Sequence, residues 1–393
     1  MPSPALLRAA LLLLLPLAAA ALAPVDEACA LNGKLLGGAC VCLRGWRGAD
    51  CAELALGAAD PAAGLQLPGN STWGGAAVRD ARGRWHLFAS LFRNGCGLNS
   101  WQPNSMVVRA EPVDAAAAPG GAWALAEVLE GSFAHSPEAR SSAADGSVTI
   151  PLIYEAGLPP CANCSAGRTG SGPGCSGWTP GTKFFGDWGT LSAPSAAGPW
   201  ALERRGSCAP SAPDAVPGCP ASGNDLNPSV AQAADGSLLM LWRSINFTTR
   251  GVSYLCTATA PRWGAAWAYN TTNLFPQAAG VHMEDGFVWR DAASGTWHLL
   301  AHADADGSQG GAAGMHGYSR DGVSWGLSPR NAYGASVLLH NGSSVGCRRR
   351  ERPKLAFLDG SAGGPPTHLF NAVVWESERS DRSVTFVVPI LEA

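Results

Sequence analysis

A unit that recurs five times along the chain limits the fold more than any other feature. Each copy reads as an apolar strand, an Asp, a Gly one to four residues later and a second apolar strand. Asp tolerates the backbone of a tight turn and Gly supplies positive φ, so each unit predicts a β-hairpin. The turn residues of the five units are Asp80, Asp145, Asp235, Asp291 and Asp359.

Further strand-forming sequence follows the hairpins and leads to a Trp at positions 123, 200, 267 and 325. Four strands per unit is the composition of a propeller blade, so we expect an all-β fold, a five-bladed β-propeller spanning residues 54–393. A β-sandwich also has many short strands, but it would not repeat one hairpin unit in this way.

Two parts of the predicted propeller depart from the repeat. The fifth unit ends after its third strand, and residues 54–67 are the natural donor of the missing one, which would close the ring. Between the second and third hairpins, Cys residues in Gly- and Pro-rich sequence predict a cysteine-rich insertion at about 159–222.

The N-terminus and the cysteines indicate export. Residues 1–23 combine Arg8, an apolar run and the small-residue site Ala21-Leu22-Ala23, as a secretory signal peptide does. A membrane anchor is the alternative, but the run is short, so we expect a secreted protein with no membrane span. Twelve Cys fit a disulfide framework. Predicted N-glycosylation sites are Asn70, Asn163, Asn246, Asn270 and Asn341.

The charge balance excludes one class of partner. A net charge of −3 with 15% charged residues gives no basic stripe, and Arg348-Arg349-Arg350 is too small a cluster to indicate nucleic acid.

Residues 24–53 form a separate cysteine-rich segment. Cys40-Val-Cys42, Gly45-Trp46-Arg47-Gly48 and a closing Cys51 resemble the second half of an EGF-like module. Lys34 stands about where that module has its third Cys, and no Cys precedes Cys29 in the mature chain. The resemblance therefore implies a two-bridge remnant with pairs Cys29–Cys40 and Cys42–Cys51. The module would serve as a rigid spacer or, alternatively, bind a protein partner.

Candidate site residues follow from the blade geometry, because inner strands begin at the central channel of a propeller. Aligning the units on their Asp turns brings Trp73-Gly74, His135-Ser136, Leu226-Asn227, Glu284-Asp285 and Glu351-Arg352 to one mouth. Paired carboxylates there suit glycosidic hydrolysis, one protonated and one ionised. We expect catalysis by Glu284, Asp285, Glu351 and Asp225. The same acids could instead form scaffold ion pairs with Arg352 and Arg290.

The expected substrate contacts include aromatic and polar side chains. Trp73 and Trp101 are candidate platforms for sugar stacking, and Cys96 could hold the Trp101 loop through a bridge. The other expected substrate-binding residues are His135, Asn227, Arg352 and His316.

The histidines divide into two groups. His86, His298 and His368 recur at one repeat position, which argues for a scaffold role. His135, His282, His302 and His316 fall outside that register and could line the channel, where a structural ion is possible. No dedicated metal-binding spacing is present, so we expect no bound metal or cofactor.

Two segments carry a family resemblance. HMEDGFVWRDAASGTWHLLAH and RERPKLAFLDG…THLF are similar to the five-bladed propeller of glycoside hydrolase family 43 and its arabinanase, levansucrase and invertase relatives. The resemblance implies hydrolysis of arabinose-, xylose- or fructose-containing glycans by a carboxylate base, an Asp that tunes the acid, and a Glu general acid.

The first two repeats depart from that family pattern. Where the base is expected, the first repeat reads Ser71-Thr72-Trp73-Gly74-Gly75, and the second offers His135 and Glu138 instead of an Asp. The expected function is hydrolysis of a polysaccharide by carboxylates at the channel mouth. The alternative is a glycan-binding or adhesion propeller that has lost the catalytic base.

Overall fold

The computed structural model describes residues 24–131, 133–142, 144–155, 164, 187–209, 211–217, 226–246, 252–278, 280–304, 313–359 and 363–392. The predicted signal peptide, most of the cysteine-rich insertion, Asn163 and Asp225 lie outside these ranges.

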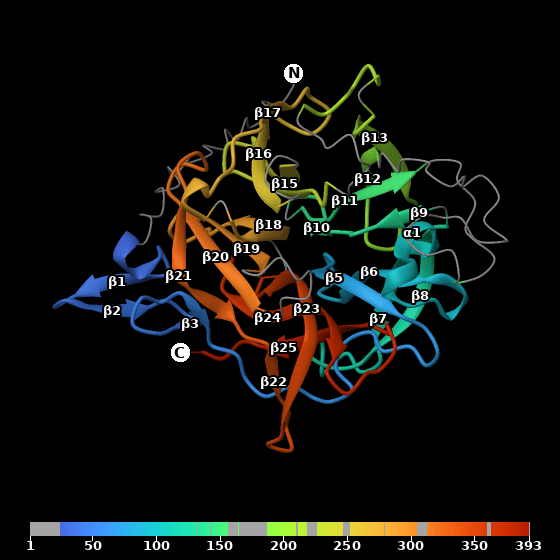
Figure 1. The fold of residues 1–393 in the computed structure, drawn as a ribbon, viewed down its shortest axis with the longest axis horizontal. Coiled ribbons are helices and arrows are strands. Elements are labelled where there is room, and N and C mark those ends of the chain that lie inside the picture. The colour runs from blue at the N-terminus through green and yellow to red at the C-terminus, as the bar shows by residue number, and fades with distance from the viewer. Residues whose placement is uncertain are drawn as a thin grey trace, which may run out of the picture.

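Antiparallel sheets surround a central axis as the blades of a five-bladed β-propeller (Figure 1). Blade 1 contains β5 (Thr72–Arg79), β6 (Trp85–Phe92), β7 (Ser105–Pro112) and β8 (Trp123–Glu130). Blade 2 contains β9 (Phe133–His135) and β10 (Arg140–Ser141) along its inner edge, then β11 (Val148–Glu155), β12 (Asp187–Ala193) and β13 (Ala201–Ser207). Blade 3 contains β14 (Ser229–Gln232), β15 (Leu238–Asn246), β16 (Val252–Ala260) and β17 (Ala268–Asn270).

Blade 4 contains β18 (His282–Arg290), β19 (Trp297–Asp304), β20 (Ala313–Ser319) and β21 (Gly326–Tyr333). Blade 5 contains β23 (Ser344–Phe357), β24 (Pro366–Trp375) and β25 (Val384–Pro389), and the start of β23 forms a ribbon with β22 (Ser336–Leu338). The short helix α1 spans Trp101–Asn104, and 3₁₀ turns occur at Glu27–Cys29, Arg93–Gly95, Leu98–Ser100 and Pro276–Ala278.

The repeat unit explains the blades. All five turn aspartates lie between the first two strands of a blade. In blade 3, Asp235 Oδ1 accepts hydrogen bonds from the Ser237 N–H (3.0 Å) and Oγ (2.6 Å), and Gly236 has a φ of 87°. The outer strand β8 begins at Trp123, and β13, β17 and β21 each begin directly after a Trp. The predicted fold class is therefore confirmed.

The N-terminal side of the propeller closes blade 5, as the sequence predicted. The Leu65 N–H donates to the Thr385 carbonyl (2.9 Å), and the Gly57 N–H donates to the Pro389 carbonyl (2.8 Å). Thr72 Oγ1 donates to the Leu65 carbonyl (2.6 Å) and accepts from the Thr385 N–H (2.7 Å). We call residues 54–67 the clasp, because they cover the edge of β25 that the repeat leaves open.

Apolar side chains fill the spaces between blades. Phe88 of blade 1 packs in one buried cluster with Ile150 and Leu152 of blade 2, and all three are fully buried. Removal of this surface from water stabilises the ring. Within the described ranges, no helix has the length and apolar character needed to cross a membrane.

The N-terminal module packs against blade 4 and projects from the ring (Figure 1). It contains the hairpin β1 (Gly33–Leu36) and β2 (Ala39–Cys42) and the ribbon β3 (Trp46–Arg47) and β4 (Glu53–Leu54). Disulfides join Cys29 to Cys40 and Cys42 to Cys51, which confirms the implied pairing. The Trp46 ring lies 4.7 Å from the His316 ring and 6.4 Å from the Trp289 ring.

The predicted glycosylation sites differ in accessibility. Asn270 and Asn341 are exposed and Asn70 is half-buried. For Asn246 only the backbone is described. Occupancy of each site stays a prediction.

The clasp can be tested with alanine substitutions at two glycines that both have a positive φ. Gly64 has a φ of 88°, and a Cβ there would overlap the Thr385 carbonyl; Gly69 has a φ of 74° and open space around it. We expect Gly64→Ala to lower the free energy of unfolding by about 3 kcal/mol, from backbone strain plus crowding. Gly69→Ala should lower it by only about 1 kcal/mol, from strain alone. Equal shifts of the urea midpoint in both variants would contradict the clasp.

Candidate functional site

One residue near the start of the inner edge of each blade has a left-handed backbone. These residues are Gly74 (φ 64°), Ser136 (58°), Asn227 (44°), Asp285 (60°) and Arg352 (52°). Positive φ is uncommon outside Gly, so its recurrence in every blade marks a structurally equivalent position. Each is the second residue of the pair that the Asp turns aligned, so this part of the alignment is confirmed.

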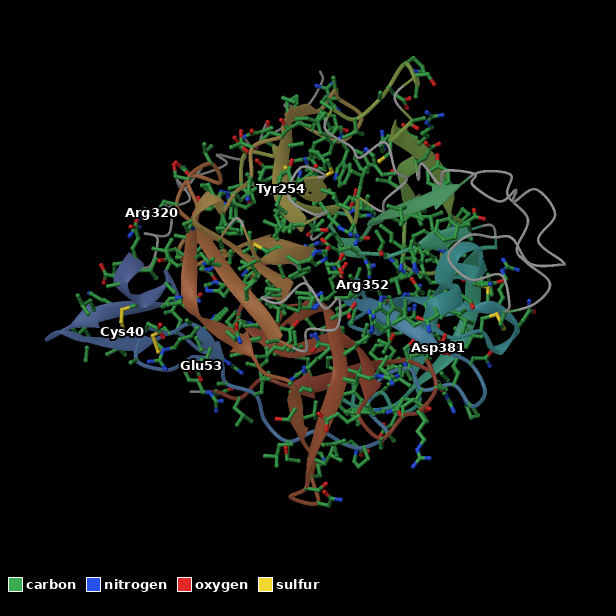
Figure 2. The ribbon with its side chains drawn as sticks, in the orientation of Figure 1. Cys40, Glu53, Tyr254, Arg320, Arg352 and Asp381 are labelled. Atoms are coloured by element: carbon green, nitrogen blue, oxygen red, sulfur yellow. A yellow bond between two sulfur atoms is a disulfide. The ribbon has the colours of Figure 1, made fainter. Side chains whose placement is uncertain are left out.

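Side-chain contacts connect four of these residues around the axis, all but Gly74, and we call the five positions the axial ring. Asn227 Nδ2 donates to Asp285 Oδ1 (2.7 Å), and Ser136 Oγ donates to Asn227 Oδ1 (3.0 Å). Arg352 Nη1 contacts Ser136 Oγ and lies 3.2 Å from Asp285 Oδ1. Figure 2 shows Arg352 at the centre of the propeller. The ring therefore fixes the side chains at the channel mouth relative to one another.

A second polar group lies in the inner strands beyond the ring. Glu138 is fully buried, and its Oε2 accepts from Lys354 Nζ (2.6 Å). Its Oε1 accepts from Arg140 Nη2 (2.6 Å) and Ser229 Oγ (2.7 Å). Lys354 and Arg140 hold the pKa of Glu138 below its ordinary value despite burial. Glu138 is therefore a buried structural anion in ion pairs.

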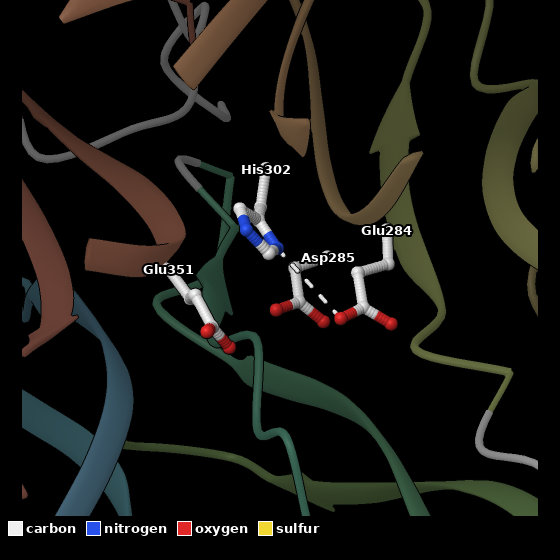
Figure 3. A group of neighbouring side chains, drawn as sticks. All are labelled: Glu284, Asp285, His302 and Glu351. Atoms are coloured by element: carbon white, nitrogen blue, oxygen red, sulfur yellow. Dashed lines mark ion pairs between the residues drawn. The ribbon is translucent and has the colours of Figure 1, made fainter. Parts of the chain in front are cut away.

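Three carboxyl groups and one imidazole meet beside the axial ring (Figure 3). One oxygen or nitrogen atom from each of Glu284, Asp285, His302 and Glu351 lies within 4.8 Å of the others. Glu284 and Asp285 enter from β18, His302 from β19 and Glu351 from β23. Asp285, His302 and Glu351 are buried, whereas the Glu284 side chain retains 14% of its exposure. We call these four residues the acid cluster.

Two carboxyl groups of the acid cluster differ in proton affinity. Burial raises the pKa of Glu351 to about 7. Burial alone would also raise the pKa of Glu284, but Arg243, whose Nη1 lies 2.9 Å from Glu284 Oε2, holds that pKa well below its usual range. Near neutral pH, Glu284 is therefore ionised while a large fraction of Glu351 keeps its proton.

His302 supplies a positive charge between these carboxyl groups. Burial by itself lowers the pKa of His302, but the charges of Glu351 and Glu284 outweigh it and raise that pKa to about 9. His302 Nδ1 lies 3.7 Å from Glu284 Oε1.

The spacing of the acid cluster would admit a cation, but its charges already have partners. Arg349 Nη1 lies 3.0 Å from Glu351 Oε1, and Arg352 and Arg243 pair with Asp285 and Glu284. Together with protonated His302, these guanidinium groups compensate the carboxylates. The expectation of no bound metal stays a prediction, as does that of a possible structural ion.

Comparison with solved structures places the propeller among known folds. A family 62 glycoside hydrolase in complex with xylotriose is 12% identical, with a TM-score of 0.54, covering 86% of this chain and 97% of that chain. A family 43 glycoside hydrolase from Bacillus licheniformis is 10% identical, with a TM-score of 0.50 and coverages of 83% and 54%. The propeller shares its fold with these glycoside hydrolases.

A protein of unknown function from Dyadobacter fermentans is equally similar, with 11% identity, a TM-score of 0.54 and coverages of 86% and 99%. At residues 25–53 the sequence matches the model of the teneurin-like EGF domain. No curated protein matches the chain.

Three of the expected substrate-binding residues are buried elsewhere. Trp73 is 2% exposed and packs with Phe92, so its ring has no face open to a sugar. His316 is fully buried and contacts His298 Nδ1 (3.1 Å) beneath Trp46, so it does not line the channel. His135 is 1% exposed, and its Nδ1 lies 2.7 Å from Ser105 Oγ. Packing from other segments covers each ring in this structure, so a substrate contact by any of the three stays a prediction.

The other expected residues divide into three groups. Trp101 is half-buried and stacks on His135 at 4.6 Å, while the nearby Cys96 forms a disulfide with Cys164, which confirms the bridge expected for that loop. Asn227 and Arg352 are buried members of the axial ring. Asp225 lies outside the described residues.

Sequence reasoning placed His302 among the histidines that could line the channel, but it did not pair His302 with the carboxyl groups. In β18 and β19, Glu284 pairs directly opposite His302. A simple count back from the turn at Asp291 would place Ala303 opposite Glu284, and the β-bulge between Glu284 and Phe287 shifts the partner to His302. Arg243 comes from blade 3, and no local pattern indicates its contact with Glu284. Arg349, by contrast, lies two residues before its partner Glu351 on β23.

The structural role of Glu138 gives a stability prediction. Glu138→Gln leaves the buried charges of Lys354 and Arg140 without a counter-charge, so the free energy of unfolding should fall by about 3–5 kcal/mol. Because the pKa of Glu138 is lower in the folded state than its ordinary value, the ionised carboxylate stabilises the fold at pH values above the ordinary Glu pKa. This stabilisation is lost as the pH falls through the lowered pKa.

Urea denaturation at pH 7 measures the loss in Glu138→Gln. Glu203→Gln is the matched control, since Glu203 is 63% exposed beside Arg205 and should shift stability by less than about 1 kcal/mol. A loss in Glu138→Gln as small as in the control would contradict the structural role.

Proposed function

We propose that this chain is a secreted carbohydrate-active enzyme that hydrolyses glycosidic bonds at the channel mouth. The observation that carries the proposal is the pair Glu351 and Glu284, which have opposite proton affinities and approach within 4.8 Å. Glycosidic hydrolysis needs one carboxylic acid and one carboxylate flanking the scissile bond. The fold shared with glycoside hydrolases, one of them bound to xylotriose, supports this reaction class.

Each group has a role that follows from its surroundings. Glu351 protonates the leaving oxygen as the bond to the anomeric carbon breaks, because its pKa of about 7 suits proton donation. Glu284 bonds to the anomeric carbon through a carboxylate oxygen, since the approach of the two carboxyl groups to within 4.8 Å is compatible with the short spacing of roughly 5 Å in retaining enzymes. Water then cleaves the glycosyl ester while Glu351 takes a proton. Asp285 and His302 position the pair and tune its charge.

Export is part of the proposal. The disulfides Cys29–Cys40, Cys42–Cys51 and Cys96–Cys164 indicate an oxidising compartment. The signal-like residues 1–23 supply the route.

The second candidate is a glycan-binding propeller without turnover. It is favoured by the absence of a carboxylate at Trp73-Gly74 and by the ion pairs that occupy Asp285 and Glu351. Binding of a glycan without release of reducing sugar from it would select this candidate.

The acid role of Glu351 predicts a large loss of rate. Glu351→Gln removes the proton donor with little change in volume, so hydrolysis should fall about 10²–10⁴-fold. The rate of hydrolysis is measured as the release of reducing sugar from arabinan, xylan, levan and pectin. Glu203→Gln is the control and should keep full activity. No release by the unaltered protein, or full release by Glu351→Gln, would overturn the assignment.

The pKa of Glu351 predicts the shape of the pH profile. Because the acid must carry its proton, kcat/KM should fall above about pH 7, roughly tenfold per pH unit. Glu284 stays ionised to well below its ordinary pKa, so the acid side of the profile should be broad. The measurement is kcat/KM between pH 4 and 9 on a substrate from the same panel. A profile that rises through pH 7 would show that Glu351 is not the acid.

A further inference from the structure

A basic cavity opens beside the acid cluster, on the face where the inner strands begin. It has a volume of about 590 Å³, within the range of ligand pockets. Its walls come from β23, the end of β24, the loop after β24 and the loop after β6. The lining residues are Leu98, Asn99, Arg348, Arg349, Val374, Arg379, Ser380 and Asp381.

Cations outnumber anions in the lining of this cavity. Arg348, Arg349 and Arg379 contribute three guanidinium groups, against the single carboxylate of Asp381. Arg348 and Arg379 are exposed. In a chain with a net charge of −3, this is a local concentration of positive charge rather than a general property of the surface.

The one acid in the lining is engaged in joining the two loops. Asp381 Oδ2 accepts from the Asn99 N–H (2.9 Å), and the Asp381 carbonyl accepts from the Leu98 N–H (2.9 Å). Arg348 Nη2 donates to the Ser380 carbonyl (2.6 Å), which uses one of its five N–H groups. The loops are therefore held in place while most guanidinium donors of Arg348 remain for a ligand.

Arg349 connects the cavity to the chemistry. Its Nη1 donates to Glu351 Oε1 (3.0 Å) while its side chain lines the cavity. A sugar whose glycosidic oxygen reached Glu351 would therefore place a neighbouring substituent or ring at the basic cavity. Guanidinium groups bind carboxylate and sulfate oxygens through paired, charge-assisted hydrogen bonds.

We propose that the substrate is an anionic polysaccharide whose carboxylate or sulfate groups bind Arg348 and Arg379 in this cavity. The proposal rests on the proposed function, since it takes Glu351 as the acid that cleaves the bound chain. Carboxylate and sulfate share the chemistry that the cavity recognises, and the experiment separates them.

The experiment measures binding, so that it does not depend on turnover. Glu351→Gln in the full-length protein is titrated by affinity electrophoresis with polygalacturonate, dextran sulfate and neutral dextran. We expect at least tenfold tighter binding to one of the two anionic polymers than to dextran, weakening as NaCl rises. Tighter binding of polygalacturonate would identify carboxylate as the bound group, and tighter binding of dextran sulfate would identify sulfate.

Two further substitutions, Arg348→Gln and Arg379→Gln, are introduced together into the Glu351→Gln protein. They should reduce this binding at least tenfold and leave the melting temperature unchanged. Arg262→Gln, an exposed arginine on the loop after β16, is the matched control and should bind as before. Equal binding of neutral and anionic polymers, or equal loss in the control, would overturn the proposal. Full hydrolytic activity of Glu351→Gln would instead overturn the proposed function and leave the anion site standing.

Discussion

The buried carboxylate of Glu138 is the interaction on which the centre of the propeller depends. It binds Lys354 of blade 5, Arg140 of its own blade and Ser229 of blade 3. Lys354 Nζ also donates to the Gly286 carbonyl of blade 4 (3.1 Å). One anion thereby links the inner strands of four blades. A buried charge of this kind is tolerated only when every partner is in place, so it favours a single arrangement of the strands.

That arrangement is what positions the site. Polar side chains at four of the five left-handed positions meet in the axial ring, and the ring holds Asp285 and Arg352 in a fixed relation. Glu284 and Glu351 directly precede them in sequence, so the backbone that forms the ring also sets the separation of the two carboxyl groups. Pre-organisation of this kind reduces the reorganisation needed when charge develops during a reaction. Stability and chemistry therefore share the same few inner-strand residues.

Local signals made much of this predictable. Turn chemistry at residues such as Asp235 and Gly236 located the hairpins, and alignment on those turns brought Glu284, Asp285 and Glu351 together. The environment of each side chain was not predictable in the same way. Trp73 is covered by the loop after β6, and His316 by Trp46, which lies far away in the sequence. Ala372 and Val374 of blade 5 also pack in the cluster around Trp73. Contacts between such separate segments leave no pattern near either residue.

The missing carboxylate of blade 1 has a physical explanation in the same ring. A Cβ at Gly74 would lie 3.2 Å from Arg352 Cδ, so the absence of a side chain there makes room for the guanidinium that pairs with Asp285. The repeat makes the five mouth positions equivalent. Two neighbouring carboxyl groups can therefore come from blades 4 and 5, and neither of them has to come from blade 1. A side chain at this position would crowd the Arg352 stem that carries the guanidinium to Asp285. The acids of this propeller and its Gly74 are thus parts of one arrangement.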